Sequence, residues 1–502
     1  MSSVESPTPA AAEGDAVSRR SLLGLCTVGA AAATAMSSQS AAAQSSALSV
    51  PNDIRFLLSR ITNGYDAPTL GRALALGYRA FLEEQLHPDT IPDGRGDAVV
   101  SMFPTLSRTS QDNYVNDYQQ GRAEMLRTEL RCATILRAAY SSRQLQERMV
   151  EFWSDHFSID HTDSMNAVLK TQDDRDVIRR HALGNFRDLL MASARSSAMG
   201  FYLGNYRNTS TQPNENYGRE IMELHTLGVG HYNEDDVKAV SRCFTGWGFK
   251  EVTTGDFGGF KFRSWLHDDT QKTVLGLAIP AGGGVAQGEI VVNLLAARPL
   301  TAQFLARKLC RFFLCYEPPQ ALVDAVANAY MGSGGEIKDM LRVVFAPTSI
   351  AQIPQAELVK YKRPFHLMTS ILRAVRFQIA EPIRLTQQLN RLGHAPFIWP
   401  TPNGYPDRLD LWASGEQTRW SFTTDLFSNA IPGVSFDPAN VFAGMPKSQL
   451  AQAANRRLTG QMLAPWDVTA IQTYVDSFPG ITDALLREVM TLTASAPSFQ
   501  IY

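Results

Sequence analysis

The sequence predicts a mainly α-helical protein, one large helical domain with a small β-hairpin or meander inserted at about residues 247–280. Apolar residues recur at intervals of three and four over long stretches, such as 122–140 and 143–157, which is the periodicity of amphipathic helices. The insertion instead alternates aromatic or β-branched residues with polar ones around glycine pairs. No repeat period and no long polar linker divides the 502 residues, so we expect a single domain over 44–502.

The elements follow in order along the chain. A first helix begins in PNDIRFLLSRI, with Pro51 and Asp53 near its first turn, and APTLGRALALGYRAFLEEQLHP supplies two more. Asn233 is expected to cap the last helix before the insertion, because three acidic residues follow it. Helices resume at about residue 287, and roughly the last 80 residues are predicted to be helical as well. Between them, HAPFIWPTPNGYPDRLDLW is predicted to be a loop, because proline breaks helices.

The first 43 residues resemble a bacterial twin-arginine signal peptide. Arg19 and Arg20 precede a mild Ala/Leu/Gly stretch, and an alanine triplet, residues 41–43, precedes Gln44. The apolar stretch is too short to span a bilayer well, and we expect no membrane span beyond the signal. These features predict export to the periplasm or the extracellular space. Proteins on this route often carry a bound cofactor, which favours a cofactor here.

Composition and cysteine spacing disfavour several classes of function. The formal net charge is −2 and no long basic run is present, so we expect no nucleic-acid partner. After removal of the signal, Cys132, Cys243, Cys310 and Cys315 remain without a Cys-x-x-Cys pair, which predicts buried free thiols. The chain has no Walker pattern and no Gly-x-Ser-x-Gly elbow, which disfavours a P-loop and a nucleophilic hydrolase.

The segment NENYGREIMELHTLG carries two acids at the edge of the apolar face of a predicted helix. On a helical wheel, Glu220 and Glu223 border that face, so we expect both to be at least partly buried. A buried carboxylate costs several kcal/mol unless a cation meets it. Arg219 or Arg242 could supply that cation in a structural salt-bridge network, or a metal ion could. A substrate amine has no support in the sequence, and the other two alternatives stay open.

Three histidines extend the metal hypothesis, each with a simpler explanation beside it. On a regular helix His225 lies about 140° from Glu220, so the two share an ion only if the helix distorts. Otherwise His225 serves a site on its own side of the helix. His156 is predicted to point inward from the end of a helix. A core histidine with a hydrogen-bond partner would explain this position without a metal ion. His267 and Asp268 end the β segment, where a polar turn would explain them equally.

Together these residues supply imidazole and carboxylate, which are ligands for zinc, iron, manganese or copper. We therefore predict a metal ion with these ligand candidates: His156, Glu220, Glu223, His225, His267 and Asp268. The candidates for catalytic positions are Glu223, Arg219 and Asn216, the last two orienting or neutralising the acids. The spare histidines are His161, His181 and His231, and the predicted loop or surface histidines are His87, His366 and His394.

Several motifs resemble a known family. They are FWSDHFS, NENYGREIMELHTLGVGHYNEDDVKAVSRCFTGW, HDDTQKTVLG, FLARKLCRFF, YKRPFHLMTSILRA and PTPNGYPD, and they occur in this order. The chain resembles the bacterial family called domain of unknown function 1800 from about residue 51 to its end. The ligand candidates and Asn216 all lie in these motifs. Many relatives have Gly-Trp where this chain has Gly404-Tyr405, and tyrosine keeps the aromatic wall.

The resemblance implies export and a possible partner, but no reaction. Members are often exported by the twin-arginine route and encoded beside a second exported family related to sulfatases and alkaline phosphatases. We therefore expect an exported envelope protein that is a metal-dependent enzyme, with hydrolytic or redox chemistry on an unidentified substrate. The alternative is a non-catalytic envelope protein that binds a polymer or assembles with the sulfatase-like partner through residues 396–412.

Overall fold

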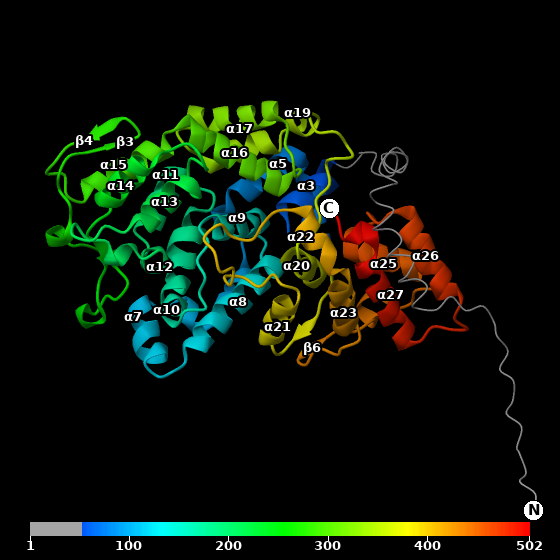
Figure 1. The fold of residues 1–502 in the computed structure, drawn as a ribbon. Helices are drawn as coiled ribbons and strands as arrows, with labels where there is room; N and C mark the ends of the chain where they lie inside the picture. Colours follow the sequence, from blue (N-terminus) through cyan, green and yellow to red (C-terminus); the bar gives the residue numbers. More distant parts are fainter. Residues whose placement is uncertain (1–52) are drawn as a thin grey trace, which may run out of the picture.

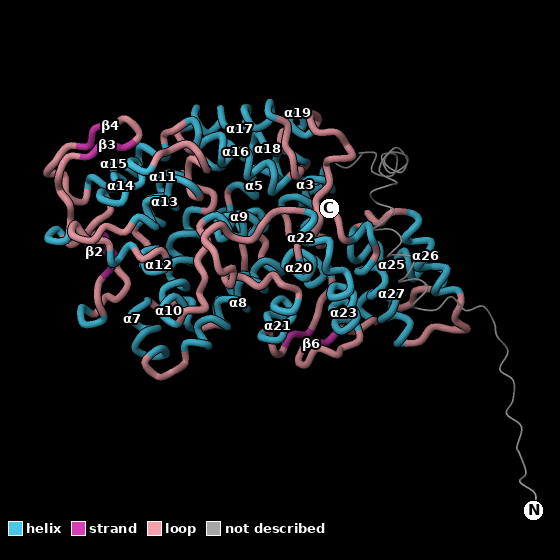
Figure 2. Tube along the Cα trace, in the orientation of Figure 1, coloured by secondary structure: helices cyan, strands magenta, loops and turns pink. Residues whose placement is uncertain are grey.

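The structure is a computed structural model that describes residues 53–502. The predicted signal peptide, residues 1–43, lies outside the described residues. The chain is mainly α-helical, as predicted, with short antiparallel strand pairs (Figures 1 and 2). In the described part, none of the helices combines the length and the hydropathy that crossing a bilayer requires.

The segment before the insertion is helical throughout, as the apolar spacing predicts. Its helices are α3 (Asp53–Ile61), α4 (Ala67–Leu76), α5 (Tyr78–Leu86), α6 (Gly94–Met102), α7 (Ser110–Asn113), α8 (Ala123–Tyr140), α9 (Gln144–His156), α10 (Ser164–Asp173), α11 (Phe186–Ala194), α12 (Ser197–Tyr202), α13 (Glu215–Glu223) and α14 (Glu234–Cys243). The predicted cap of α14 is confirmed. Asn233 Oδ1 accepts from the Asp236 amide at 2.9 Å, and the Asp236 carboxylate accepts from the Asn233 amide at 3.2 Å.

The predicted insertion consists of two separate antiparallel hairpins. Their strands are β1 (Trp247–Phe249) with β2 (Phe260–Phe262), and β3 (Lys272–Val274) with β4 (Leu277–Ile279). Leu275 and Gly276 join β3 to β4 with φ angles of 49° and 82°, a left-handed pair of the kind that closes two-residue hairpin turns. The helices then resume as predicted, with α15 (Ala286–Ala296), α16 (Pro299–Phe313), α17 (Gln320–Ser333), α18 (Ile337–Val344) and α19 (Pro347–Ile350).

The C-terminal part is helical around one long loop. Its helices are α20 (Pro364–Ala374), α21 (Ile383–Arg391), α22 (Leu409–Trp412), α23 (Glu416–Phe427), α24 (Ala439–Phe442), α25 (Leu450–Thr459), α26 (Pro465–Asp476) and α27 (Asp483–Ser495). A third strand pair, β5 (Gln378–Ile379) with β6 (Val434–Ser435), was not predicted. Two-residue strands so far apart in sequence leave no alternating pattern to detect. The predicted loop, residues 394–412, is confirmed as far as residue 408, but its last four residues form α22.

The buried side chains form two large hydrophobic cores. The first joins helices from α3 to α18, and the second joins one face of α8 with α20, α23 and α25 to α27. Helix α8 packs against both α10 and α20, so it lies between the cores (Figure 1). The loop before α22 also connects the two cores, because it packs on α9. The four described cysteines are buried free thiols, as predicted. That residues 44–502 form a single domain stays a prediction.

Candidate functional site

The predicted metal ligands lie in three separate places. His156 and His225 are buried together in the first core, Glu220 and Glu223 are half-buried on α13, and the pair at 267–268 lies between α14 and β3. Within residues 53–502, no three His, Cys, Asp or Glu side chains are grouped so that they could hold a metal ion. The geometry therefore does not assemble the predicted set, and metal binding itself stays a prediction.

The end of α13 explains why His225 leaves the two acids. The helix ends at Glu223, and the His225 amide donates to the Glu220 carbonyl at 3.1 Å, five residues back, which is a wider turn than an α-helix. The distortion that His225 needed to reach Glu220 is thus present. It nevertheless places the imidazole in the core, 6.0 Å from His156 between ring centroids.

The two acids on α13 are bound by neither of the predicted arginines. The Tyr232 hydroxyl donates to Glu223. Burial, followed by the charge of Glu223, raises the pKa of Glu220 above its usual range. Arg219 instead donates to both carboxylate oxygens of Glu234, at 2.9 and 2.8 Å. The hypothesis that Arg219 neutralises Glu220 and Glu223 in a salt bridge is therefore wrong.

Asn216, the third catalytic candidate, lies at the surface. Its side chain is exposed, and its amide nitrogen donates to the Leu203 carbonyl at 3.1 Å. This contact ties the start of α13 to the end of α12. Nothing in it orients Glu220 or Glu223, so the contact explains Asn216 as a structural residue.

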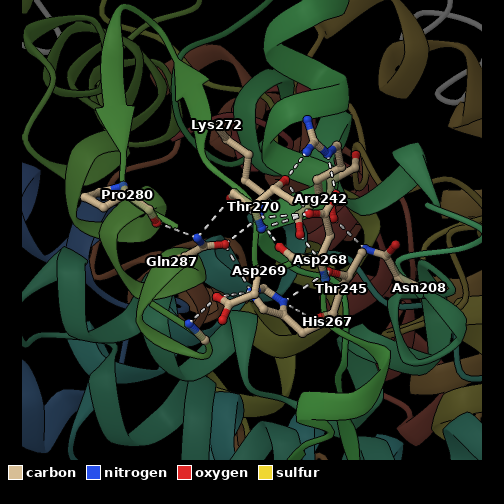
Figure 3. A network of polar contacts seen from close by, with 12 residues as sticks. Asn208, Arg242, Thr245, His267, Asp268, Asp269, Thr270, Lys272, Pro280 and Gln287 are labelled. Atoms are coloured by element: carbon tan, nitrogen blue, oxygen red, sulfur yellow. Dashed lines mark hydrogen bonds and ion pairs between the residues drawn. The ribbon is translucent and has the colours of Figure 1, made fainter. Parts of the chain in front are cut away.

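Asp268 lies at the centre of a closed polar network between α14, β3 and α15 (Figure 3). Arg242, the second predicted cation, donates from Nε to Asp268 Oδ2 at 2.6 Å. The amide and hydroxyl of Thr270 donate to Oδ1 at 3.1 and 2.6 Å, and Lys272 Nζ lies 3.7 Å from the same oxygen. Burial alone would raise the pKa of Asp268, but these donors hold it below its usual range. Asp268 is therefore a carboxylate fixed between two cations.

His267 belongs to the same network. Its Nδ1 lies 2.8 Å from the Thr245 carbonyl, and its Nε2 lies 3.0 Å from Gln287 Oε1 (Figure 3). A metal-bound histidine has one ring nitrogen on the metal and the other hydrogen-bonded. Here both nitrogens have protein partners, so His267 would have to break one contact to bind an ion.

A cavity of about 40 Å³ opens between α9 and the loop that precedes α22, and we call it the α9 crevice. This is room for about three water molecules or for one end of a ligand. The side chains that line it and that matter below are Glu151, Ser154, Asp155, His394, Trp399 and Tyr405. The crevice thus has acids on its helical side and rings on its loop side.

Three segments far apart in the sequence meet at Asp155. Arg363, directly before α20, donates to Asp155 Oδ2 at 2.7 Å and also binds Glu151. Gly404, in the loop, has a φ of 70°, and a Cβ there would lie 2.0 Å from the Asp155 carbonyl oxygen. Only glycine fits that approach. The FWSDHFS, YKRPFH and PTPNGYPD motifs are therefore parts of one structure.

Asp155 is the most perturbed acid of this crevice. Its side chain is 25% exposed, and burial raises its pKa to about 6 even though Arg363 binds it. Arg363 is shared with Glu151, so its charge is divided between two carboxylates. Next to Asp155, the buried Ser154 hydroxyl has no hydrogen-bond partner in the described part of the chain. A carboxyl that exchanges protons near neutral pH beside an unpaired hydroxyl is typical of functional sites.

Behind Asp155, buried hydrogen bonds join Lys308, His156 and His225 in a chain. Lys308 Nζ donates to His156 Nδ1 at 3.0 Å, and His156 Nε2 donates to the His225 carbonyl at 3.1 Å. Burial lowers the pKa of Lys308 to about 8, although Asp155 opposes this. Burial and then Lys308 lower the pKa of His225 to about 3, so both imidazoles are neutral. His156 therefore points inward, as predicted, with hydrogen-bond partners at both ring nitrogens.

One prediction about histidines was wrong, and Asp155 was missed. His366 and His394 were expected in loops or at the surface. His366 is instead buried in α20, whereas His394 lies in a loop but is buried and lines the α9 crevice. Asp155 sits beside His156 in a motif that drew attention only to the imidazole. Glu151 lies four residues before Asp155, which places two acids on one face of a helix. That spacing was the available signal, but it resembles an ordinary solvated face.

A family model described as "Protein of unknown function (DUF1800)" matches residues 56–501. The chain therefore belongs to this family, and the predicted resemblance is confirmed. No curated protein and no solved structure matches the chain. The family description states no reaction, so any function must be argued from the geometry.

Proposed function

We propose that the protein is an exported enzyme of the cell envelope and that Asp155, in the α9 crevice, is its proton-transferring group. The observation that carries the proposal is the meeting of three distant segments at Asp155 beside a cavity. Arg363 orients the carboxyl at 2.7 Å, and Gly404 brings the loop against the Asp155 backbone. A charged group arranged in this way, at the edge of a cavity, suits acid–base chemistry.

The parts of the crevice have complementary roles in this proposal. A carboxyl with a pKa of about 6 can give a proton to a leaving group or accept one from water near neutral pH. Trp399 and Tyr405 offer ring faces against which an apolar part of a substrate can pack. The Ser154 hydroxyl can bond a polar substrate atom. Of the two predicted chemistries, this arrangement favours hydrolysis.

The test is a screen with the mature protein purified from its native export route. Envelope oligosaccharides, peptides and phosphodiesters are incubated with it, and product release is followed by mass spectrometry. For a substrate so found, Asp155→Asn should lower the rate about 100-fold or more while binding persists. Trp399→Phe should weaken binding. Trp466→Phe, on α26 and 48% exposed, is the matched control and should change neither. Wild-type rates in Asp155→Asn would refute the role of Asp155.

Metal dependence is tested in the same preparation. The predicted zinc, iron, manganese or copper is measured by elemental mass spectrometry, and melting is compared with and without a chelator. A stoichiometric metal retained by Asp155→Asn would show that the ion and the α9 crevice are independent. A metal lost in that variant would tie the two together.

A second candidate function, assembly with a sulfatase-like exported protein, has one specific observation in its favour. In the predicted contact segment 396–412, Tyr405 and Trp412 face inward, but Leu409 and Leu411 of α22 are 48% and 47% exposed. An exposed apolar pair of this kind suits a protein contact. Co-purification with the partner should then fail for Leu409→Ser/Leu411→Ser and persist for Leu74→Ser, which changes another exposed leucine. Equal recovery of all three proteins would contradict assembly through α22.

Export itself is proposed from Arg19 and Arg20 and the alanine triplet at 41–43. Replacing both arginines with lysine should leave the uncleaved chain in the cytoplasm. Cell fractionation followed by intact mass measurement checks this. Normal export of the variant would show that the route is not the twin-arginine one.

A further inference from the structure

A second cavity, of about 350 Å³, lies where α4, α6, the end of α8 and α20 meet. It shares no lining residue with the α9 crevice. The side chains that line it and that matter below are Asp66, Thr69, Arg95, Tyr140, Ser141 and Arg373. The lining is therefore polar and includes two arginines.

Arg373 is a buried guanidinium without an acid in contact. It is 6% exposed, and its nitrogens donate to the carbonyls of Gly64, Ala139 and Ser141 at 3.1 to 3.2 Å and to the Thr69 hydroxyl at 2.6 Å. All four acceptors are neutral, and in residues 53–502 no carboxylate lies within ion-pair distance of it. Burial lowers the pKa of Arg373 to about 10, and the charges of Asp66 and Asp93 oppose this only in part, so a further anion would stabilise the cation.

Arg95 adds a second positive charge at the rim. Its side chain is 54% exposed, and its nearest acid is Asp66 at 3.9 Å. One oxygen of Asp66 already accepts from the Thr69 amide at 3.0 Å. Asp93, the next acid, lies directly behind the lining, where it accepts from the Ser141 hydroxyl at 2.6 Å. The cavity lining thus carries two guanidinium groups and one carboxylate.

Further donors face the same space. Burial raises the pKa of Tyr140 to about 12, so its hydroxyl stays protonated and can donate. Helices α4 and α6 also begin at the cavity, at Ala67 and Gly94, but the side chains of Asp66 and Asp93 already cap their first turns.

We infer that this cavity binds an anion, specifically a phosphate group held between Arg95 and Arg373 with the Tyr140 hydroxyl as a further donor. Arg95 can donate to a phosphate in a pair, and Arg373, whose other N–H groups already have acceptors, can add one more donor. The phosphate could belong to a soluble ligand or to a lipid headgroup of the envelope. The site is independent of the chemistry proposed for Asp155.

Isothermal titration of inorganic phosphate into the mature protein at low salt tests the inference. One phosphate should bind per chain, and Arg95→Gln should weaken its binding about tenfold or more, because one charge-assisted contact is lost. Tyr140→Phe should weaken it less, by about threefold. Arg72→Gln is the matched control, since Arg72 is an equally exposed arginine of α4 that pairs with Glu84 outside the cavity, and it should bind as the wild type does.

Vesicles distinguish the two sources of phosphate. Co-sedimentation with phosphatidylglycerol vesicles that is lost in Arg95→Gln and competed by free phosphate would identify a headgroup, whereas phosphate binding without co-sedimentation would identify a soluble ligand. No phosphate binding in either assay, or equal binding by Arg95→Gln and Arg72→Gln, would overturn the inference. Asp155→Asn should bind phosphate normally, so failure of the proposed enzyme activity leaves this result intact.

Discussion

The Asp268 network and the α9 crevice both place a carboxylate beside an arginine, but they differ in how many cations and hydrogen-bond donors contact that carboxylate. Asp268 lies between two cations, Arg242 and Lys272, and hydrogen bonds reach both of its oxygens. Asp155 contacts one guanidinium, Arg363, which also binds Glu151, and Glu151 is paired with Arg148 as well. The first carboxyl has a lowered pKa and the second a raised one. Burial opposes ionisation at both acids, and the cations and Thr270 donors outweigh it at Asp268, whereas Arg363 does not outweigh it at Asp155.

The two regions also differ in how completely their polar groups are paired. In the Asp268 network Lys272 donates to the Asp268 carbonyl, the Thr270 carbonyl and Gln287, so its charge is spread over several oxygens. In the α9 crevice the Ser154 hydroxyl has no hydrogen-bond partner among residues 53–502, and a cavity lies beside it. A closed network resists change, whereas an open one leaves groups free for a ligand.

The largest effect is expected from Asp268→Asn. The change leaves Arg242 and Lys272 without their shared counter-charge, which should lower the free energy of unfolding by about 3–5 kcal/mol. Urea denaturation followed by circular dichroism measures it. Asp235→Asn, also in this part of the chain but 95% exposed, is the control and should stay within about 0.5 kcal/mol of wild type. A loss below about 1 kcal/mol for Asp268→Asn would contradict the structural role of Asp268.

The next effect concerns pH and should have opposite signs at the two acids. The folded pKa of Asp155 is about 6, above its usual value of 3.8, so the folded state holds that proton more tightly. Its contribution to stability is therefore present at low pH and lost as pH rises from about 4 through 6, by at most about 3 kcal/mol. Asp268 has a lowered pKa, so its contribution is present above 3.8 and lost as pH falls.

Urea denaturation of the wild type and of Asp155→Asn between pH 4 and 7 measures the first of these. The difference between the two proteins isolates the contribution of Asp155 from that of the buried histidines. The histidines act in the opposite direction, because they make the folded state less stable as pH falls below 6.5. Parallel curves for the two proteins would mean that Asp155 titrates normally, and its proposed role would lose its basis.

Local features of the sequence predicted most of the fold and little of the site. The cap at Asn233 and the hairpins near 247–280 depend on neighbouring residues, so their patterns are visible along the chain. The α9 crevice depends on Arg363 and Gly404, which contact Asp155 from more than 200 residues away. No single-sequence pattern reports such a contact. The helical wheel placed His225 away from Glu220, and the structure has it there, in the core beside His156.

A smaller effect is expected from Glu223→Gln. Glu223 is half-buried and accepts from the Tyr232 hydroxyl, and neither Arg219 nor Arg242 binds it. Glutamine can still accept this hydrogen bond, so the free energy of unfolding should fall by less than about 1 kcal/mol. Thermal and urea melts measure the change, and Tyr232→Phe should match it. A loss of about 3 kcal/mol would mean that Glu223 neutralises a buried cation after all.

The smallest expected effect is an energetic coupling, and it bears directly on the metal prediction. Glu220 and His267 are both ligand candidates, but they share no partner in the described residues, because Glu220 lies beside Glu223 while His267 binds Thr245 and Gln287. The stability changes of Glu220→Ala and His267→Ala should therefore add in the double variant to within about 0.5 kcal/mol. Two ligands of one ion would behave differently, since the first substitution already releases the metal and the second then costs little. A coupling above about 1 kcal/mol, abolished by a chelator, would show that a bound ion joins two regions that otherwise stabilise the fold separately.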